Sequence, residues 1–388
     1  MTDEANITRG TRPRAIAAQT LITADGIVHD PLIFLRDGIV ERVSSFDRDT
    51  LPEGTLYLPH CTLSAGFLDV HVHGAGGRDV MESTPEAIRT VAKVLAGHGT
   101  TSFLATTVTA ELDHTFRALE GIADAIEAAA PDDAATIVGI HLEGPFLSHE
   151  KRGVHTAALL QQPSIALFDR FQQAARGYIR LMTVAPELPD ALEMITHATS
   201  LGVRVSMGHS DAIAGQARAG IAAGAASATH TFNAMRGLTQ REPGMLGVVL
   251  DADALYAELI CDGIHTTPEA VRLWLRMKGE HRGILVTDGM AATGMPDGDY
   301  LLGEMNVTVS KGVAMHEGVL AGSVLTMDRA VAKVQAFTGC GLATAVRLAS
   351  RNPHAMLGDN PAMDTSADFN IFNADGARVA TILRGTVL

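Results

Sequence analysis

The sequence has few cysteines and no long apolar run. Its three cysteines, Cys61, Cys261 and Cys340, are odd in number, widely spaced and outside any CxxC pattern. We therefore expect free thiols, and neither a disulfide framework nor a structural zinc knot. No segment approaches the roughly 18 to 20 consecutive apolar residues of a membrane span, and residues 1–26 contain no apolar stretch of signal-peptide length. These absences predict a cytoplasmic protein.

Positive charge is also scarce. The chain has 30 lysine and arginine residues against 44 aspartate and glutamate residues, so its formal net charge is −14. Nucleic acids and anionic membranes are bound through basic surfaces, and neither is expected as a partner. The pattern GxxxxGK[ST] is absent, and Asp79 stands where a dinucleotide-binding loop beginning at Gly74 would need its third glycine. A small anionic substrate stays possible where basic residues gather locally.

Strand-like and helix-like runs alternate through the middle of the chain. The 388 residues, 46% of them hydrophobic, can bury one large core and still supply a minor domain. Eight runs resemble buried strands: LSAGFLDVHVHG, TSFLATTVT, ATIVGIHLE, IRLMTVAPE, VRVSMGHS, SATHTFN, YAELICDG and GILVTDG. Helical segments such as TPEAIRTVAKVLAGHG separate them. This rhythm predicts an α/β fold, specifically a (β/α)8 TIM barrel with a parallel sheet covered by helices.

The two ends of the chain have a different pattern. Both consist of short alternating segments with turns, at Asp37-Gly38 and at residues 373–376. We expect the termini to form one small β-sandwich domain, from residues 1–62 and 353–388, with the barrel at residues 63–352. Residues 300–323 are β-like and punctuated by glycine. They are expected either to cover the mouth of the barrel pocket or to extend the small β-domain.

Six potential metal ligands lie at or just past the C-terminal ends of apolar runs: His71, His73, Glu143, His209, His230 and Asp288. In a parallel barrel these ends meet in a single pocket. Each residue has a structural explanation when taken alone, because alternation places both imidazoles of His71-Val72-His73 on one face of any strand, and Asp288 could cap a helix. Coincidence at five strand ends is a weaker explanation than one shared site.

The chemistry of these side chains predicts the cofactor. Imidazole and carboxylate suit a borderline divalent ion, so we expect one or two metal ions per chain, with zinc favoured and iron, cobalt or manganese as alternatives. A carbamylated lysine, a common bridging ligand in such barrels, is not available, because none of the five lysines ends a strand. Glu143 is the best candidate for a bridge. Metal-assisted hydrolysis is the reaction class that this set of residues favours.

Eight short motifs, in order, resemble N-acetylglucosamine-6-phosphate deacetylases of the amidohydrolase superfamily: GFLDVHVHG, HLEGPFLS, GHSDA, HTFNAM, REPG, DGIH, TDGM and LAGS. The resemblance spans nearly the whole chain, and HLEGPF with HTFNAM is specific to this family. It implies hydrolysis of the acetamide of N-acetylglucosamine 6-phosphate to glucosamine 6-phosphate and acetate. Gly289, Thr231 and Thr266 stand where alanine, leucine and valine are common, and none of these departures removes a candidate ligand.

The resemblance and the chemistry together suggest two catalytic residues. Asp288 would take a proton from the attacking water and deliver it to the departing amine. His155 matches a family position that faces the substrate, and it could donate a hydrogen bond to the developing oxyanion. A solvated loop histidine is its alternative interpretation.

Recognition of the 6-phosphate is implied by the resemblance alone. It points to Arg241, to His265 and to the backbone near Asn233 and Ala234. A guanidinium offers a planar fork for phosphate oxygens. The resemblance further implies a homodimer in which Arg241 and His265 come from the neighbouring subunit.

Three other interpretations stay open. A cyclic amidohydrolase, such as a dihydroorotase or hydantoinase, would use the same barrel, but the missing strand-end lysine and the HLEGPF motif argue against it. A non-catalytic sugar-phosphate binder would have lost the ligand set or Asp288, and this chain keeps both. N-acetylgalactosamine 6-phosphate as the substrate is not distinguished from its gluco epimer.

Overall fold

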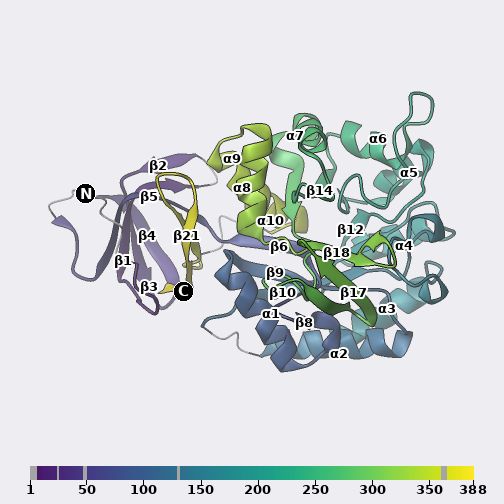
Figure 1. The fold of residues 1–388 in the computed structure, drawn as a ribbon, viewed down its shortest axis with the longest axis horizontal. Coiled ribbons are helices and arrows are strands. Elements are labelled where there is room, and N and C mark those ends of the chain that lie inside the picture. Colours follow the sequence, from purple (N-terminus) through teal and green to yellow (C-terminus); the bar gives the residue numbers. More distant parts are fainter. Residues whose placement is uncertain (1–6, 24–25, 47–49, 129–131, 360–364) are drawn as a thin grey trace.

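The computed structural model describes residues 7–23, 26–46, 50–128, 132–359 and 365–388. It consists of a small β-domain, to which both the N-terminal and the C-terminal strands belong, and a larger α/β-domain beside it (Figure 1). Among the described residues, no helix is long and apolar enough to cross a lipid bilayer.

The larger domain is a (β/α)8 barrel, as predicted. Its parallel strands pair in chain order: β6 (Phe67–Val72), β9 (Thr100–Thr107), β10 (Thr136–Glu143), β11 (Ile179–Val184), β12 (Arg204–Met207), β13 (Ser227–Ala228), β14 (Tyr256–Ile260) and β15 (Gly283–Val286). The first and last strands meet at a parallel bridge between Val72 and Gly289. Beside it, the backbone N–H of Asp288 donates to the carbonyl of His71 at 2.9 Å. The barrel therefore closes at its C-terminal end, next to two predicted ligands.

Helices cover the outside of the barrel (Figure 1). They are α1 (Pro85–Gly97), α2 (Leu112–Glu127), α3 (Ile165–Ala174), α4 (Ala191–Ser200), α5 (Ala214–Ala223), α6 (Gly244–Asp251), α7 (Pro268–Arg282), α8 (Met327–Thr338), α9 (Leu342–Ala349) and α10 (Arg351–Leu357), with single 3₁₀ turns at Val80–Glu82, His149–Lys151 and Ala157–Leu159. Helices α1 and α7 begin in the same way. A threonine hydroxyl accepts from the backbone N–H three residues on, and a proline occupies the first turn, where no backbone donor is needed.

A separate antiparallel sheet lies across the C-terminal end of the barrel. Its strands are β16 (Gly298–Leu302), β17 (Met305–Ser310), β18 (Val313–His316) and β19 (Val319–Leu320). It buries its own apolar side chains, among them Val307, against Met290 and Ala292 in the segment after β15. Of the two positions expected for residues 300–323, the one over the pocket is therefore correct. A short hairpin, β7 (Gly74–Ala75) and β8 (Arg78–Asp79), follows β6.

The small domain is one continuous sheet of eight strands. They are β1 (Ala15–Ile22), β2 (Ile27–His29), β3 (Pro31–Arg36), β4 (Ile39–Ser45), β5 (Thr55–Ala65), β20 (Phe369–Phe372), β21 (Arg378–Leu383) and β22 (Thr386–Val387). The sheet curls over its own core, because a bridge joins Ile39 at its β4 edge to Ser366, just before β20. The domain limits at residues 62 and 352 stay predictions; β5 continues through position 62 to Ala65 before the chain enters the barrel.

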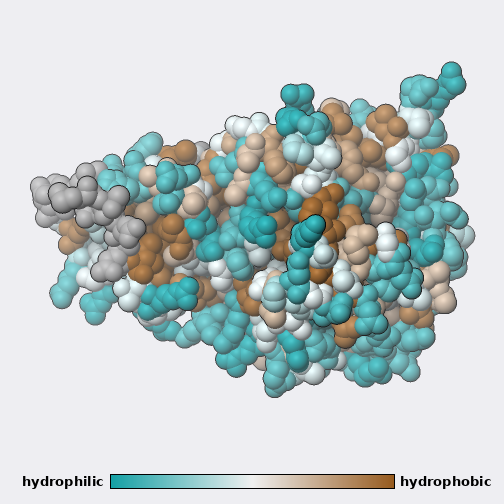
Figure 2. Space-filling model, viewed as in Figure 1, coloured by the Kyte–Doolittle hydropathy of each residue, from teal (hydrophilic) through white to brown (hydrophobic). Residues whose placement is uncertain are grey.

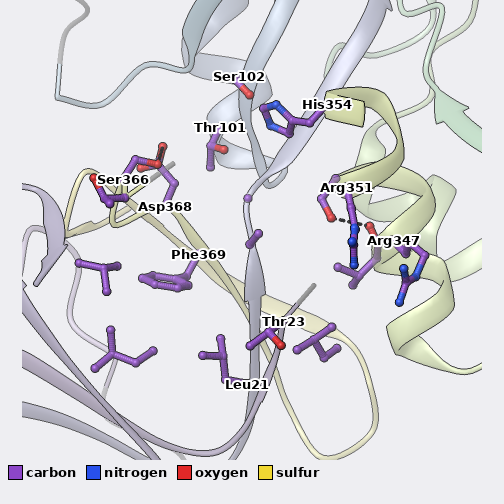
Figure 3. Close-up of a pocket in the computed structure, with 18 of the residues that line it drawn as sticks. Leu21, Thr23, Thr101, Ser102, Arg347, Arg351, His354, Ser366, Asp368 and Phe369 are labelled. Atoms are coloured by element: carbon purple, nitrogen blue, oxygen red, sulfur yellow. Dashed lines mark hydrogen bonds between the residues drawn. The ribbon is translucent and has the colours of Figure 1, made fainter. Parts of the chain in front are cut away.

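A cleft of about 520 Å³ lies between the small domain and the barrel (Figure 3). On the barrel side it is lined by Thr101 and Ser102 at the start of β9 and by Thr136 at the start of β10. Active sites of such barrels lie at the opposite, C-terminal ends of the strands. Neither group of potential metal ligands found among the described residues lies in this cleft. The reaction site must be sought at the other end of the barrel.

Candidate metal centre

The barrel brings the six predicted ligands together at its C-terminal end. Glu143 is the last residue of β10, and His209, His230 and Asp288 each follow a strand by two residues. All six side chains are buried. The prediction of a shared pocket at the strand ends therefore agrees with the geometry, although the metal-binding role of each residue stays a prediction.

Glu143 occupies the middle of the cluster. Its Oε1 lies 3.4 Å from His71 Nε2, 3.2 Å from His209 Nε2 and 3.4 Å from His230 Nε2. Its Oε2 lies 3.3 Å from His73 Nε2. A carboxylate with one oxygen toward each half of the cluster has the placement that a bridging ligand needs.

Asp288 completes the half of the cluster that contains the His-Val-His pair. Its Oδ1 lies 3.2 Å from His73 Nε2 and 3.5 Å from His71 Nε2. One ligand atom from each of these three residues falls within 4.8 Å of the others, which is close enough for one ion. The arrangement is compatible with a second metal position beside the one around Glu143 and His209.

Backbone carbonyls orient two of the imidazoles. His73 Nδ1 donates to the carbonyl of Thr106 at 3.1 Å, and His209 Nδ1 donates to the carbonyl of Lys151 at 2.9 Å. A carbonyl can only accept, so Nδ1 carries the proton in both rings. The lone pair of each Nε2 is then free for a cation, which is the usual arrangement of metal-binding histidines.

Several buried atoms of the cluster have no hydrogen-bond partner among the described residues. They include His71 Nε2 and Glu143 Oε1, which point toward each other at 3.4 Å. Leaving buried polar atoms unpaired costs about 1 to 3 kcal/mol each. A divalent cation would satisfy them, and nitrogen and carboxylate oxygen are donors that zinc and similar ions accept. The residues present therefore fit a divalent metal.

The ionisation of the cluster follows from its burial and its charges. Burial raises the pKa of Glu143, but the surrounding histidines outweigh it and hold that pKa well below its usual value. Asp288 is affected in the same way by His71 and His73. Burial opposes protonation of His73, and hydrogen bonds to the two carboxylates overcome it, so its pKa rises to about 9. A bound cation would take the place of these protons.

Three of the six residues have unusual backbone conformations. His209, His230 and Asp288 have φ angles of 46°, 30° and 50°, in the left-handed region that non-glycine residues seldom occupy. Such strain is found where surrounding structure enforces it, most often at functional sites. Here it occurs where the chain leaves a strand and directs the side chain into the pocket.

His155 is buried beside the cluster, and it is not a solvated loop histidine. Its Nδ1 accepts from the backbone N–H of Thr109 at 3.4 Å, so the ring proton lies on Nε2, which is 3.8 Å from Glu143 Oε2. Burial, followed by the charge of His209, lowers its pKa to about 3, and the ring is neutral at pH 7. A neutral N–H aimed into the pocket can act as a hydrogen-bond donor.

This assignment bears on a second possible grouping, in which Glu143, His155 and His209 hold an ion. We favour His230 over His155 as the third ligand. His230 Nε2 lies 3.0 Å from His209 Nε2 and 3.4 Å from Glu143 Oε1, closer than His155 comes to either oxygen of that carboxylate. The proton on His155 Nε2 would also have to be removed before it could bind metal.

Five of the six residues, all except His71, line a pocket of about 480 Å³. Asn233, Ala234 and His265 of the same chain line it, and Leu302 and Val319 of the overlying sheet form part of its wall. Asp262 Oδ2 accepts from His265 Nδ1 at 2.7 Å. Burial lowers the pKa of His265, but Asp262 outweighs this and raises it, which favours a cation at the pocket wall.

Arg241 is the one predicted substrate residue that does not line this pocket. It is exposed, in the segment just before α6. That segment projects from the barrel at the upper right of Figure 1, and its tip is hydrophilic in Figure 2. In contrast, His265 lines the pocket of its own chain. Whether it also reaches the pocket of a neighbouring subunit stays a prediction.

Two buried polar residues of the barrel interior were not identified from the sequence. His141 packs edge-on against His71 with ring centroids 4.6 Å apart, and Glu258 approaches His71 Nδ1 at 3.3 Å. Alternation could have revealed His141, because it precedes Glu143 by two positions on the same strand. Glu258 interrupts the apolar run YAELI, and a charged residue inside a buried strand is itself a signal.

Gly289, which departs from the expected motif, is closely packed against two threonines. A Cβ at this position would lie 2.8 Å from the Thr293 hydroxyl and 3.2 Å from the Thr287 hydroxyl. The larger side chain would therefore require these neighbours to move, next to Asp288.

A sequence model of the amidohydrolase family matches residues 62–386. This chain belongs to that family. It is 33% identical over 384 residues to N-acetylglucosamine-6-phosphate deacetylase of Bacillus subtilis, and the match covers 95% of each chain. It is 36% identical over 344 residues to N-acetylgalactosamine-6-phosphate deacetylase of Escherichia coli O157:H7, and this match covers 88% of this chain and 89% of that one.

Solved structures agree with these relatives. The complex of a mutant N-acetyl-D-glucosamine-6-phosphate deacetylase from Mycobacterium smegmatis with N-acetyl-D-glucosamine-6-phosphate superposes with a TM-score of 0.90. It is 33% identical, and the match covers 96% of this chain and 98% of that one. The family resemblance seen in the sequence motifs is thus confirmed.

Proposed function

We propose that this protein is a metal-dependent hydrolase that removes the acetyl group of N-acetylglucosamine 6-phosphate, releasing glucosamine 6-phosphate and acetate. The observation that carries the proposal is the convergence of four histidines and Asp288 around Glu143 at the C-terminal end of the barrel. The names of the relatives supply the substrate.

The proposed metal ligands are His71, His73, Glu143, His209, His230 and Asp288, with zinc as the favoured ion. A divalent ion held here would lower the pKa of a water molecule to around 7 and polarise the acetamide carbonyl.

Asp288 is proposed as the residue that moves the proton. Its lowered pKa keeps the carboxylate ionised at neutral pH, so Oδ1 can accept a proton from the attacking water. The same oxygen can then return that proton to the leaving nitrogen. His155 is proposed to donate its Nε2–H to the carbonyl oxygen, where negative charge develops as the bond to water forms.

Phosphate recognition is proposed to combine groups from two subunits. His265, whose pKa Asp262 raises, lines the pocket of the same chain together with Asn233 and Ala234. Arg241 is exposed and outside that pocket, which supports a role in the pocket of a neighbouring copy. We accordingly propose a homodimer. The cytoplasmic location stays a prediction.

Acetate release from a panel of compounds tests the proposal. The panel should contain the 6-phosphates of N-acetylglucosamine and N-acetylgalactosamine, both sugars without phosphate, and a cyclic amide such as dihydroorotate. We expect the highest kcat/KM with N-acetylglucosamine 6-phosphate. The galacto epimer is the second candidate, because a relative of equal similarity carries that name. No acetate from either phosphorylated sugar would refute the proposed function.

A further inference from the structure

Glu258 is a fully buried carboxylate inside the barrel. It lies on β14, and its side chain reaches toward the metal cluster. Its Oε2 is 3.3 Å from His71 Nδ1 and accepts from the backbone N–H of His230 at 3.4 Å. Its Oε1 has no hydrogen-bond partner among the described residues. The mechanism proposed above does not use this residue.

Packing alone does not account for a carboxylate at this position. The side chain of Glu258 has no exposed surface, and its Oε1 accepts no hydrogen bond from the described residues. Placing a charged group in such surroundings is costly unless a cation or hydrogen-bond donors compensate it. Among the described residues, the side chain that pairs with Glu258 is the ring of His71, at 3.3 Å. The free-energy cost of burying Glu258 is therefore offset through its contact with His71, which points to a role in orienting that ring.

The hydrogen bond determines which nitrogen of His71 faces the cluster. When Nδ1–H donates to Glu258, the lone pair of Nε2 is directed toward Glu143 Oε1 at 3.4 Å and Asp288 Oδ1 at 3.5 Å. A carboxylate behind a metal-binding histidine fixes the orientation of the ring and makes it a stronger donor. The rings of His73 and His209 have only backbone carbonyls in this position.

We propose that Glu258 is a positioning residue that holds His71 ready to bind a second metal ion together with His73 and Asp288. The proposal rests on the metal centre of the proposed function and deepens it. It predicts that loss of Glu258 weakens one metal position, while the position around Glu143 and His209 keeps its affinity.

Metal binding of the purified full-length protein tests this directly. Metal-free wild type, Glu258→Gln and Glu258→Leu are titrated with zinc against a chromophoric chelator and with cobalt by visible absorption. We expect Glu258→Leu to weaken one of two zinc equivalents by about 10- to 100-fold. Glu258→Gln should lose less, because its amide oxygen can still accept from Nδ1. Glutamine is nearly the same size as glutamate, so Glu258→Gln can still be titrated if the leucine variant does not fold.

Two further variants separate this role from a general effect on folding. Ser227→Ala removes a buried polar atom from the adjacent strand β13, one that has no hydrogen-bond partner among the described residues. It should bind both equivalents as the wild type does. In a double-mutant cycle, Glu258→Leu should cause no further loss of zinc affinity in a His71→Asn background, because its effect acts through that ring.

Three results would overturn the proposal. The first is that both Glu258 variants bind two zinc equivalents as tightly as the wild type. The second is that the losses of zinc affinity in the double-mutant cycle are additive. The third is that His71→Asn binds zinc as tightly as the wild type. Failure of the proposed function would look different: the wild type would release no acetate, whatever its metal content. The cobalt absorption reports on the metal position itself, so it separates the two failures.

Discussion

Replacing Asp288 by asparagine removes the proposed proton carrier with almost no change in size. The carboxylate lies 3.2 Å from His73 Nε2, and its lowered pKa keeps it ionised at neutral pH. General acid–base catalysis typically contributes about 10²- to 10⁴-fold, which corresponds to roughly 3 to 5 kcal/mol of transition-state stabilisation. The amide cannot take up a proton at neutral pH. We therefore expect kcat to fall by at least about 10²-fold while KM changes by a few-fold.

The assay is acetate release under saturating substrate, with metal content measured in the same sample. This second measurement is needed because Asp288 is also a proposed ligand. Turnover near that of the wild type would refute the proton-transfer role. A loss of turnover that follows the loss of metal, and that is reversed by excess zinc, would identify Asp288 as a ligand alone.

Asp328→Asn provides a control and a prediction of its own, because Asp328 pairs with His98 and Arg378 outside the pocket. Burial raises the pKa of Asp328, but hydrogen bonds from His98 and Thr326 and the charge of Arg378 outweigh it and lower the pKa from 3.8 to about 2. The charged form therefore contributes up to about 2 kcal/mol of stability above pH 4, and this is lost as the pH falls toward 2. The variant should unfold at lower denaturant concentration yet keep wild-type kcat, and unchanged stability would contradict the linkage. Removing metal with a chelator should abolish activity, with recovery on adding zinc, iron, cobalt or manganese; full activity in verified metal-free protein would exclude the mechanism. Arg241→Ala and His265→Ala should each lower kcat/KM for the 6-phosphate and leave the rate on the unphosphorylated sugar nearly unchanged, whereas equal losses on both would argue against phosphate recognition. Because Asp262 raises the pKa of His265, the contribution of the protonated ring should persist to higher pH than that of an ordinary histidine and be lost as the pH rises through the raised pKa. KM for the phosphorylated sugar should then increase in the wild type but not in His265→Ala. Mixed dimers of Asp288→Asn and Arg241→Ala subunits should regain activity after subunit exchange, and no recovery would place Arg241 outside the partner's pocket.

Much of the fold could be predicted because local sequence carries it. Most barrel strands are short, largely buried apolar runs, and helices separate them along the chain. The six candidate ligands could be predicted for the same reason. A charged or polar side chain at the end of such a run can be assigned to the pocket without knowing which strands are neighbours, because all parallel strands of a barrel end on one side.

Relationships between distant segments required the tertiary structure. The central position of Glu143 depends on β10 facing β6, β12 and β13 across the barrel, and no local pattern specifies those distances. The same applies to Glu258, whose partner His71 is 187 positions away in the chain. Hydrogen bonds of this kind depend on side-chain direction and strand stagger, which periodicity leaves open.

The surroundings of the pocket were also decided by the tertiary structure. Alternating residues predicted strands in residues 300–323, but the sequence allowed them to join either domain, and only packing against Met290 and Ala292 selected the position over the pocket. His265 and Arg241 were predicted together from short motifs. The fold separated them, with one in the wall of its own pocket and the other on a projecting segment. Sequence thus determined which side chains were available and the elements that carry them, while barrel closure determined which of them meet, because contacts between distant segments depend on the whole packed structure.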